Sequence, residues 1–376
     1  MVKARTLVAL MLALGGTATQ AAPLEVKLGF AAPLTGPQAH YGKDMQNGVL
    51  LAIEEANAGK PKIGGKEVRF VLLSEDDQAD PRSGTVVAQR LVDAGIKGML
   101  GHFNSGTSIP ASKVYAAAGI PQVSMATSPV YTEQGFKTTF RMMTSDTQQG
   151  SVLGRFVVSR LGFKNLAIID DRTAYGQGLA DQFEKAAKAA GAKIVAREFT
   201  TDKAVDFSAI LTRIKPTGAQ AIFYGGSEVQ AAPMAKQLHQ LGFRTTLISG
   251  EMVKSDGFIK LAGDAAEGVV ASLAGLPLEK MPGGASYVAR YEKRFGSRVE
   301  TYSPYAYDGT QALIAAMKKA NSVEPAKYLP QLAAIKLAGV SSGQLGYDAR
   351  GDLKQGGITV YRVSKGKWEV LESLGK

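Results

Sequence analysis

Residues 68–101 read VRFVLLSEDDQADPRSGTVVAQRLVDAGIKGMLG and contain the unit from which the fold is built. Val68–Leu73 is apolar and partly β-branched and predicts a strand, and Gly98–Gly101 predicts a second one. Arg82–Ala94 predicts the helix between them. The dipeptide Asp80-Pro81 opens this helix well, because Asp accepts hydrogen bonds from free amides and Pro fits the first turn. A strand, a helix and a strand at this spacing indicate parallel pairing in one sheet.

The same alternation extends in both directions along the chain. Around the first unit we expect further strands at Val26–Phe30 and Pro121–Met125 and further helices at Tyr41–Asn57 and Ser105–Ala118. A second run predicts helices at Gln149–Leu161, Gly176–Ala190, Asp206–Ile214 and Val229–Leu241, and strands at Asn165–Asp170, Lys193–Phe199, Ala219–Tyr224 and Thr246–Gly250. Two such runs in series predict an α/β protein with two doubly wound, Rossmann-like lobes.

The C-terminal part has a different pattern. It predicts three helices and a terminal β-hairpin, at Ser286–Phe295, Tyr305–Ala320, Pro325–Leu332 and Ile358–Leu371. No low-complexity linker divides the lobes, which favours short ordered crossovers and a hinge. Sheets of this type bind ligands at the carboxyl ends of their strands, so we expect a ligand cleft where the two lobes face each other.

Residues 1–22 have the pattern of a secretory signal peptide. A positively charged start precedes the apolar run Leu7–Leu14 and the small residues of Thr17–Ala22, and we expect cleavage after Ala21 or Ala22. The apolar run is shorter than the about 20 residues that a membrane-spanning helix needs. We therefore expect an exported chain with no membrane anchor of its own.

Bulk composition narrows the class of protein further. Removing 22 of the 376 residues leaves 354, which is more than one hydrophobic core usually serves. The chain has no cysteine, so it has neither a disulfide nor a lipid-attachment site behind the signal, and the bacterial periplasm fits best. The formal net charge is +11, but basic residues are spread along the chain, whereas nucleic-acid binding needs a concentrated basic face.

Sequence motifs for catalysis are scarce. The three histidines, His40, His102 and His239, lie far apart and have no metal-ligand spacing. There is no Gly-x-Ser-x-Gly motif, no Walker loop and no thiol nucleophile. Tyr175–Gly178 lacks the third glycine of a dinucleotide motif, and a solvated turn is the simpler interpretation of Glu75–Asp77. We expect no catalysis and no metal or organic cofactor.

Hydroxyl-bearing residues follow two neighbouring predicted strands. Asn104–Ser108 opens a helix, and Ser124–Ser128 follows the next strand. Free amides at a helix start, with serine hydroxyls beside them, can bind a small anion such as a carboxylate. Serine and threonine also cap helices for purely structural reasons, so both interpretations stay open on this pattern alone.

The second run also places polar residues just beyond its predicted strands, namely Tyr175, Ser227, Glu228 and Glu251. An apolar strand and Gly250 bring Glu251 to a strand end, where its carboxylate can pair an ammonium group. Taken alone, an exposed loop charge is the simpler interpretation of Glu251. Together with a carboxylate site on the other lobe, it suggests a zwitterion gripped from both sides.

An ordered series of short motifs runs through nearly the whole mature chain. They are LTGP at 34–37, YG at 41–42, DD at 76–77, DP at 80–81, GH at 101–102, Ser105, PAS at 110–112, YGQG at 175–178, YGG at 224–226, GDAAEG at 263–268 and YDARGD at 347–352. Each motif is weak alone, but their order is specific. With this series the chain resembles the periplasmic leucine/isoleucine/valine-binding proteins of bacterial ABC importers.

The resemblance implies the type I periplasmic binding protein fold, in which two lobes joined by three crossovers close over a free amino acid. We expect residues 23–145 and 276–354 to form lobe 1, which holds the carboxylate of the ligand. Residues 146–275 and 355–376 are expected to form lobe 2, which pairs its ammonium group. An inner-membrane ABC permease is the implied protein partner, and a monomer is the implied state.

The resemblance also implies roles for single residues. The expected ligand-binding residues are Tyr41, Ser105, Ala126, Thr127, Ser128, Tyr175, Ser227, Glu251 and Tyr302. Ser105, the Ala126 backbone and Ser128 are expected to hold the α-carboxylate, and Glu251 to pair with the α-ammonium.

The remaining implied positions concern the ligand side chain. Tyr175 is expected to cover the ligand and Tyr41 to line its side-chain pocket. Ser227 stands where the family carries a tyrosine, and Tyr302 falls near an expected phenylalanine. These departures leave the backbone-binding groups intact and put the identity of the side chain in doubt.

The function expected from the sequence is capture of an aliphatic or branched-chain amino acid by hinge closure and its delivery to the permease. One alternative is the same fold with an aromatic carboxylate, an amide or a urea-like ligand. Glu251 argues against a simple organic anion, because with no ammonium group to pair it, its carboxylate would face the ligand as an uncompensated charge. Another alternative is a sensor that reports ligand occupancy to a receptor.

Overall fold

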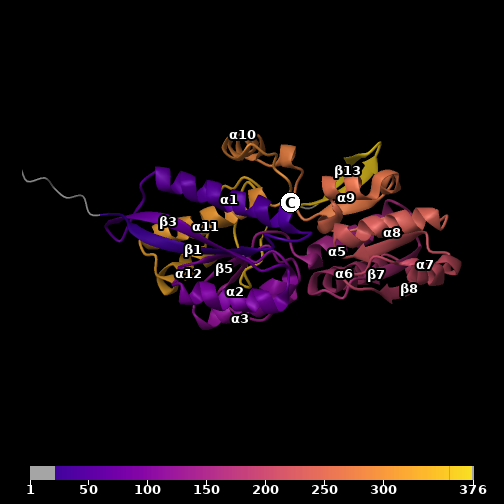
Figure 1. The fold of residues 1–376 in the computed structure, drawn as a ribbon, viewed down its shortest axis with the longest axis horizontal. Helices are drawn as coiled ribbons and strands as arrows, with labels where there is room; N and C mark the ends of the chain where they lie inside the picture. Colours follow the sequence, from indigo (N-terminus) through magenta and orange to yellow (C-terminus); the bar gives the residue numbers. More distant parts are fainter. Residues whose placement is uncertain (1–21, 355, 375–376) are drawn as a thin grey trace, which may run out of the picture.

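The strand-helix alternation builds two α/β lobes that lie side by side along the long axis of the molecule (Figure 1). A computed structural model describes residues 22–354 and 356–374. Apart from Ala22, the predicted signal peptide lies outside these residues.

Lobe 1 is built on a six-stranded sheet of order β2-β3-β1-β4-β5-β6. Its strands are β1 Leu24–Ala32, β2 Lys62–Ile63, β3 Lys66–Asp76, β4 Met99–Gly101, β5 Gln122–Ser124 and β6 Thr139–Arg141. All pairs are parallel except β2 with β3. Its helices are α1 Ala39–Ala58, α2 Pro81–Asp93, α3 Ser105–Ala117, α4 Val130–Glu133, α10 Gly284–Phe295, α11 Ser303–Ala320 and α12 Pro325–Ala333. Helices α1 and α11 cover one face of the sheet, and α2 and α3 cover the other (Figure 1).

Lobe 2 is built on a seven-stranded sheet of order β13-β12-β11-β10-β9-β7-β8. Its strands are β7 Asn165–Asp170, β8 Lys193–Phe199, β9 Ala221–Gly225, β10 Thr246–Ser249, β11 Val270–Leu273, β12 Ile358–Ser364 and β13 Lys367–Leu374. The pairs of β12 are antiparallel and the others are parallel. Its helices are α5 Asp146–Ser159, α6 Ala174–Ala189, α7 Ser208–Ile214, α8 Glu228–Gln240 and α9 Asp256–Ala262. Four short 3-10 helices complete the described elements: η1 Lys215–Thr217, η2 Glu251–Val253, η3 Gly263–Ala266 and η4 Leu278–Lys280.

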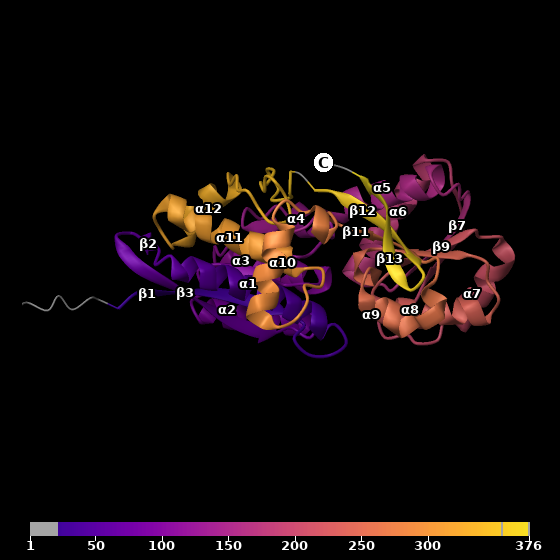
Figure 2. The ribbon, with the colours of Figure 1, turned by 90° about the horizontal axis from the view of Figure 1, so that it is seen from above.

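The described chain passes between the lobes three times: between β6 and α5, between β11 and α10, and between α12 and β12. Figure 2 shows α10 and α9 on opposite sides of the junction that these crossovers span. The predicted α/β fold with two doubly wound lobes and three crossovers is confirmed. The exact boundaries predicted at 145/146, 275/276 and 354/355 stay predictions.

Local sequence explains why the first predicted unit forms. The Asp80 carboxylate accepts hydrogen bonds from the backbone amides of Arg82 and Ser83 at 2.9 and 2.8 Å, and Pro81 occupies the first turn of α2. Val87, Ala88 and Leu91 of this helix are buried, so one apolar stripe faces the sheet.

The topology brings several strand ends to the junction. In lobe 1, the segments that follow β4 and β5 contain Ser105 and Thr127. In lobe 2, the segments after β7 and β10 contain Tyr175 and Glu251. Among the described residues, no helix is long and apolar enough to cross a bilayer.

Candidate ligand-binding site

A small cavity of about 10 Å³ lies where the two lobes meet. It is lined by Phe103, Asn104, Ser105, Met125, Thr127 and Tyr302 of lobe 1 and by Tyr175, Glu251 and Met252 of lobe 2. The structure thus brings together the predicted residues Ser105, Thr127, Tyr175, Glu251 and Tyr302. This volume holds about one water molecule, so a ligand of amino-acid size requires the lining side chains to move apart.

Ser105 is placed by the start of α3. It is the first residue of that helix and is 2% exposed. Its hydroxyl oxygen accepts a hydrogen bond from the backbone amide of Ser128 at 3.2 Å. The hydroxyl proton remains for a second acceptor, and the helix N-terminus favours negative charge beside it.

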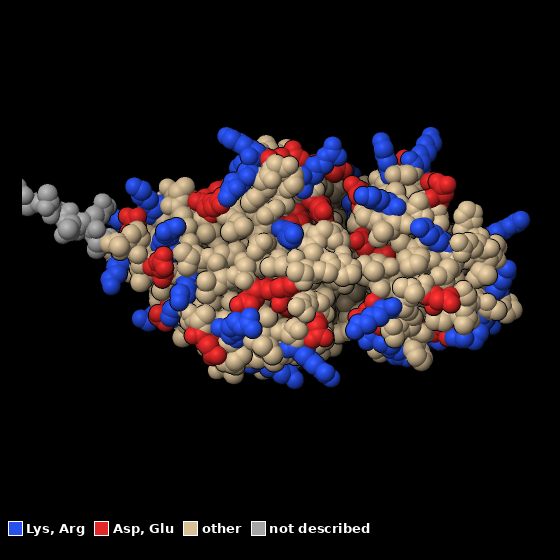
Figure 3. Space-filling view, viewed as in Figure 1, with Lys and Arg blue, Asp and Glu red and all other residues tan. Residues whose placement is uncertain are grey.

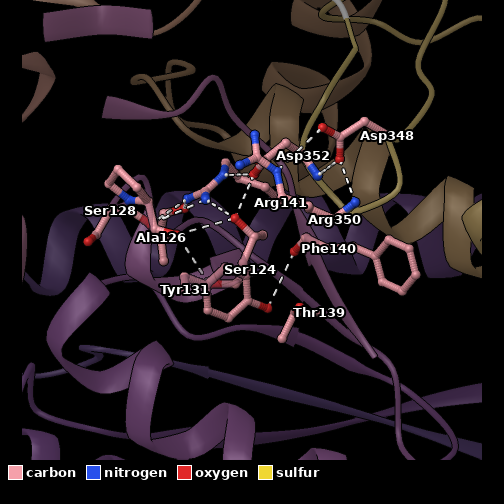
Figure 4. Close-up of polar contacts among 12 residues, drawn as sticks. Ser124, Ala126, Ser128, Tyr131, Thr139, Phe140, Arg141, Asp348, Arg350 and Asp352 are labelled. Carbon is pink, nitrogen blue, oxygen red and sulfur yellow. Dashed lines mark hydrogen bonds and ion pairs between the residues drawn. The ribbon is translucent and has the colours of Figure 1, made fainter. Parts of the chain in front are cut away.

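Arg141 holds the segment 126–128 that follows β5. Its guanidinium donates to the carbonyl oxygens of Ala126 and Ser128 and, through Nε, to Asp352 Oδ1 at 2.8 Å (Figure 4). It also donates to Thr132 Oγ1 at 2.9 Å and is itself fully buried. These hydrogen bonds from one guanidinium fix the backbone on either side of Thr127, which lines the cavity.

Tyr302 is placed by a buried carboxylate on α1. Asp44 accepts hydrogen bonds from the backbone amides of Tyr302 and Ser303, each at 2.8 Å, and from those of Glu300 and Thr301 at 3.3 and 3.2 Å. These amides stand at the start of α11, so the carboxylate satisfies donors that the helix itself cannot. Tyr302 therefore enters the cavity from a rigid helix terminus.

Aromatic rings form one wall of the site. Tyr302 lies edge-on to Tyr41 and Phe103, with ring centroids 5.2 and 4.8 Å away. Tyr41 does not line the cavity itself, but its hydroxyl donates to the carbonyl of Met252 in lobe 2 at 3.2 Å. This hydrogen bond connects the lobes behind the aromatic wall.

Two carboxylates of lobe 2 are buried beside Thr127. Glu251 begins η2, is 3% exposed and accepts a hydrogen bond from Gln149 Nε2 at 2.5 Å. Asp146, the first residue of α5, is fully buried, and neither of its carboxylate oxygens has a hydrogen-bond partner within residues 22–354 and 356–374. The Gln149 amide also donates to Ser272 at 2.9 Å, which holds it in place between the two chain segments.

The electrostatics of this pair favour a cation. Burial and the negative charge of Glu251 raise the pKa of Asp146 well above its usual range, and the Thr127 hydroxyl and Arg141 lower it less. Burial also raises the pKa of Glu251, against the opposing effects of a backbone amide and Gln149. Two acids that resist ionisation side by side mark a place where a positive charge is stabilising.

The other predicted residues lie outside the cavity. The Ala126 amide donates to Ser124 Oγ at 3.0 Å and its carbonyl is bound by Arg141, so both groups have protein partners. Ser128 does not line the cavity, and its backbone amide donates to Ser105 Oγ at 3.2 Å. Ser227 precedes α8, and its hydroxyl donates to Gln230 Oε1 at 2.8 Å. The ligand roles of these residues, like those of the cavity residues, stay predictions.

Sequence reasoning missed Asp146 and Gln149 as well as the apolar lining residues Phe103, Met125 and Met252. Asp146 was overlooked because the predicted helix began at Gln149, whereas α5 begins three residues earlier. The Ser145-Asp146 pair is a recognisable helix start and was the available signal.

Comparisons with known proteins indicate the family of the chain. A model of the periplasmic binding protein family matches residues 25–367. The Leu/Ile/Val-binding protein homolog 1 of Brucella abortus is 36% identical over 363 residues, which are 95% of this chain and 94% of the relative. The leucine-, isoleucine-, valine-, threonine- and alanine-binding protein of Pseudomonas aeruginosa is 30% identical over 341 residues, 90% of each chain.

A solved structure extends the likeness to three dimensions. The crystal structure of the leucine binding protein LivK of Thermotoga maritima has a TM-score of 0.84 and 25% identity, and the match covers 93% of this chain and 98% of that chain. Each of these three names describes a binding protein. From its family match, its relatives and its two-lobed architecture, the chain belongs to the periplasmic binding protein family, with the type I fold.

Proposed function

We propose that the protein captures a free aliphatic amino acid, of the branched-chain type, between its lobes and delivers it to an ABC permease of the inner membrane. The observation that carries this proposal is the buried pair of Asp146 and Glu251 at the junction, near the hydroxyls of Ser105 and Thr127. Buried acids and hydroxyl donors at one junction fit the two charges of a zwitterion.

At the acidic end, the ligand ammonium group would supply the missing positive charge. Arg141 is the cationic side chain that lowers the pKa of Asp146, but its guanidinium already binds Asp352 and two carbonyl groups. An ammonium group donates three hydrogen bonds, and neither oxygen of the Asp146 carboxylate has a hydrogen-bond partner in the part of the chain that the structure describes. Pairing a buried carboxylate with a cation offsets its desolvation, which is otherwise several kcal/mol.

The ligand carboxylate would bind at the start of α3. The Ser105 hydroxyl is a donor there, and the helix N-terminus adds a favourable field. These contacts are common to all α-amino acids, so they set the class of ligand and not its side chain.

The side chain would contact the apolar part of the lining, which is made of Phe103, Met125, Met252 and the ring of Tyr302. This surface favours an aliphatic group. One methylene in such a pocket discriminates by about 1–3 kcal/mol, so related side chains are expected to bind with graded affinity. The names of the two relatives, which both include leucine, isoleucine and valine, support this range.

Ligand binding would act by shifting the lobes toward the closed arrangement, since only that arrangement brings both ends of the site to one ligand. We propose that the closed surface is the form that the permease recognises. The same surface would serve a receptor equally well, so transport of the bound amino acid by cells is the assay that separates importer from sensor.

A thermal-shift screen of refolded, ligand-stripped protein tests the proposed ligand class. A ligand at 100 times its Kd stabilises the native state by about 2.7 kcal/mol, so leucine, isoleucine or valine should raise the melting temperature. We expect Glu251→Gln to abolish this shift, whereas Glu267→Gln, at an exposed glutamate of lobe 2 away from the cavity, should leave it intact. A shift with aromatic carboxylates or amides and none with amino acids would reject the zwitterion site.

We also propose that the protein works as a periplasmic monomer after cleavage behind Ala21 or Ala22. N-terminal sequencing of protein recovered from a periplasmic extract should begin at Ala22 or Pro23, and size-exclusion chromatography with light scattering should give the mass of one chain. Recovery of the intact N-terminus from the membrane fraction would reject both cleavage and release.

A further inference from the structure

A histidine and a glutamate face each other across the junction, outside the ligand cavity. His40 lies on α1 of lobe 1, and Glu228 is the first residue of α8 of lobe 2. His40 Nε2 is 3.1 Å from Glu228 Oε1, which is an ion-pair distance, although the N–H is not well aligned for a hydrogen bond. Because the two residues belong to different lobes, opening of the lobes separates them.

The Glu228 carboxylate is held rigidly in lobe 2. It is 3% exposed, and its other oxygen accepts a hydrogen bond from the Ser255 hydroxyl. The Ser255 carbonyl in turn accepts a hydrogen bond from Trp368 Nε1 at 2.8 Å. The N-terminus of α8 stabilises the negative charge of Glu228. Lobe 2 therefore presents a carboxylate in a fixed position to His40.

The His40 ring is held on lobe 1 by its neighbour Tyr41, whose ring centroid is 3.9 Å away. Its side chain is 32% exposed and opens into a groove of about 760 Å³ between the lobes, so it can exchange protons with water. The charged residues that share this groove with His40 are Glu228, Lys254, Asp256, Glu279, Arg298 and Glu300.

The charges around His40 favour its protonated form. Burial alone lowers the pKa of His40, but the contact with Glu228 and the charges of Glu228 and Glu300 outweigh it and raise the pKa above its ordinary value. His40 in turn lowers the pKa of Glu300, which burial and the nearby Asp44 raise. The histidine is therefore the positive partner of an acidic cluster to which both lobes contribute.

We infer that His40 and Glu228 form an inter-lobe latch, a positioning pair that does not touch the ligand but strengthens its binding when His40 is protonated. The inference rests on the proposed function, because it assumes that the ligand is gripped by closure. The closed lobes hold the His40 proton more tightly than separated lobes do, so closure and proton uptake are linked.

The direction of the pH effect follows from the sign of this shift. The contribution of the latch to affinity is fully present below the ordinary histidine pKa of about 6.5 and is lost as pH rises through the raised value of the closed form. Each pKa unit between the two forms is worth a factor of ten in affinity. We expect leucine to bind roughly three- to tenfold more weakly at pH 8.5 than at pH 6.

Calorimetric titration of leucine into ligand-stripped protein between pH 6 and 8.5 tests the latch. His40→Gln should weaken binding at pH 6 by roughly the same three- to tenfold factor and flatten the pH profile. Glu228→Gln should do the same, and the double variant should be no weaker than either single one, because both remove one interaction. His239→Gln, at an exposed histidine in the last turn of α8, is the matched control and should keep the wild-type profile.

A ligand-free measurement separates failure of the latch from failure of the proposed function. Because the chain has no cysteine, Lys43→Cys on α1 and Lys260→Cys on α9 allow a pair of spin labels to be placed on exposed positions of the two lobes. Lowering the pH from 8.5 to 6 should shift their distances toward the closed value, and His40→Gln should remove that shift.

Unchanged leucine binding and lobe distances in His40→Gln would overturn the latch and leave the proposed function standing. If no amino acid binds to the wild-type protein, the proposed function fails, and the spin-label distances alone then decide whether the latch exists.

Discussion

At the residue scale, Asp146 and Glu251 are acidic side chains of the candidate site whose burial disfavours their charged forms. Burial raises the pKa of both, and the oxygens of Asp146 have no hydrogen-bond partner among the described residues. A structure selected for stability alone would replace one of them with a neutral residue. Natural proteins break local rules of this kind where function requires it.

Asp146→Asn is therefore expected to stabilise the ligand-free protein while it weakens amino-acid binding. Relief of a buried unsatisfied group is worth about 1–3 kcal/mol at neutral pH. Since the native pKa of Asp146 is raised, the wild-type protein regains this stability as pH falls through the raised value, and the difference between the two proteins should shrink there. Thermal melts at several pH values, together with leucine titration, measure both effects.

Asp170→Asn is the matched control for this prediction. Asp170 is equally buried but is paired with Arg197 Nη1 at 2.7 Å, so loss of its charge should lower stability. If Asp146→Asn also lowered the melting temperature and left binding unchanged, Asp146 would be a structural residue and not part of the ligand site.

At the element scale, helix termini and strand ends place the site residues, and this part was readable from the sequence. Strands β7 and β8 have the predicted bounds, and the cap at Asp80 is confirmed, because apolar runs and capping residues are local signals. The short strands β6 and β11 were missed: three or four residues give no periodicity, and their pairing is set by neighbours distant in the sequence.

The candidate site shows the same difference between local patterns, which the sequence reveals, and contacts with residues distant in the sequence, which it does not. Ser105, Thr127 and Glu251 follow predicted strands, so topology alone brought them to the junction. Ser227 also follows a strand, but its hydroxyl donates a hydrogen bond to Gln230 of the helix that it precedes. The sequence pattern did not predict this contact. The apolar lining residues carry no chemical signal in the sequence, because phenylalanine and methionine are ordinary core residues.

The capping of α11 by Asp44 provides a prediction at this scale. Asp44→Ala leaves four amides at the start of α11 without their acceptor and frees Tyr302, so we expect a loss of about 1–3 kcal/mol in stability and weaker leucine binding. Asp80→Ala removes a cap from α2, away from the site, and should cost about 1 kcal/mol with no change in affinity. Equal affinities for the two variants would show that Tyr302 is not positioned for the ligand.

At the scale of the whole molecule, residues of both lobes line one cavity. Their charged side chains are mixed over the face shown in Figure 3, so no single-sign patch on that face explains binding. Closing the lobes without a ligand buries both carboxylates of lobe 2, Asp146 and Glu251, with no added cation. An ammonium group relieves this cost, so ligand binding and closure favour each other.

The most direct test of this account is a calorimetric comparison of leucine with two analogues that each lack one charge, isopentylamine and 4-methylpentanoate. A buried charge left without its partner costs about 3–5 kcal/mol. We therefore predict that leucine binds to the ligand-stripped protein and that each analogue loses at least about a hundredfold in affinity. Binding of 4-methylpentanoate as tight as that of leucine would contradict the account, because Asp146 and Glu251 would then have no ammonium group to hold.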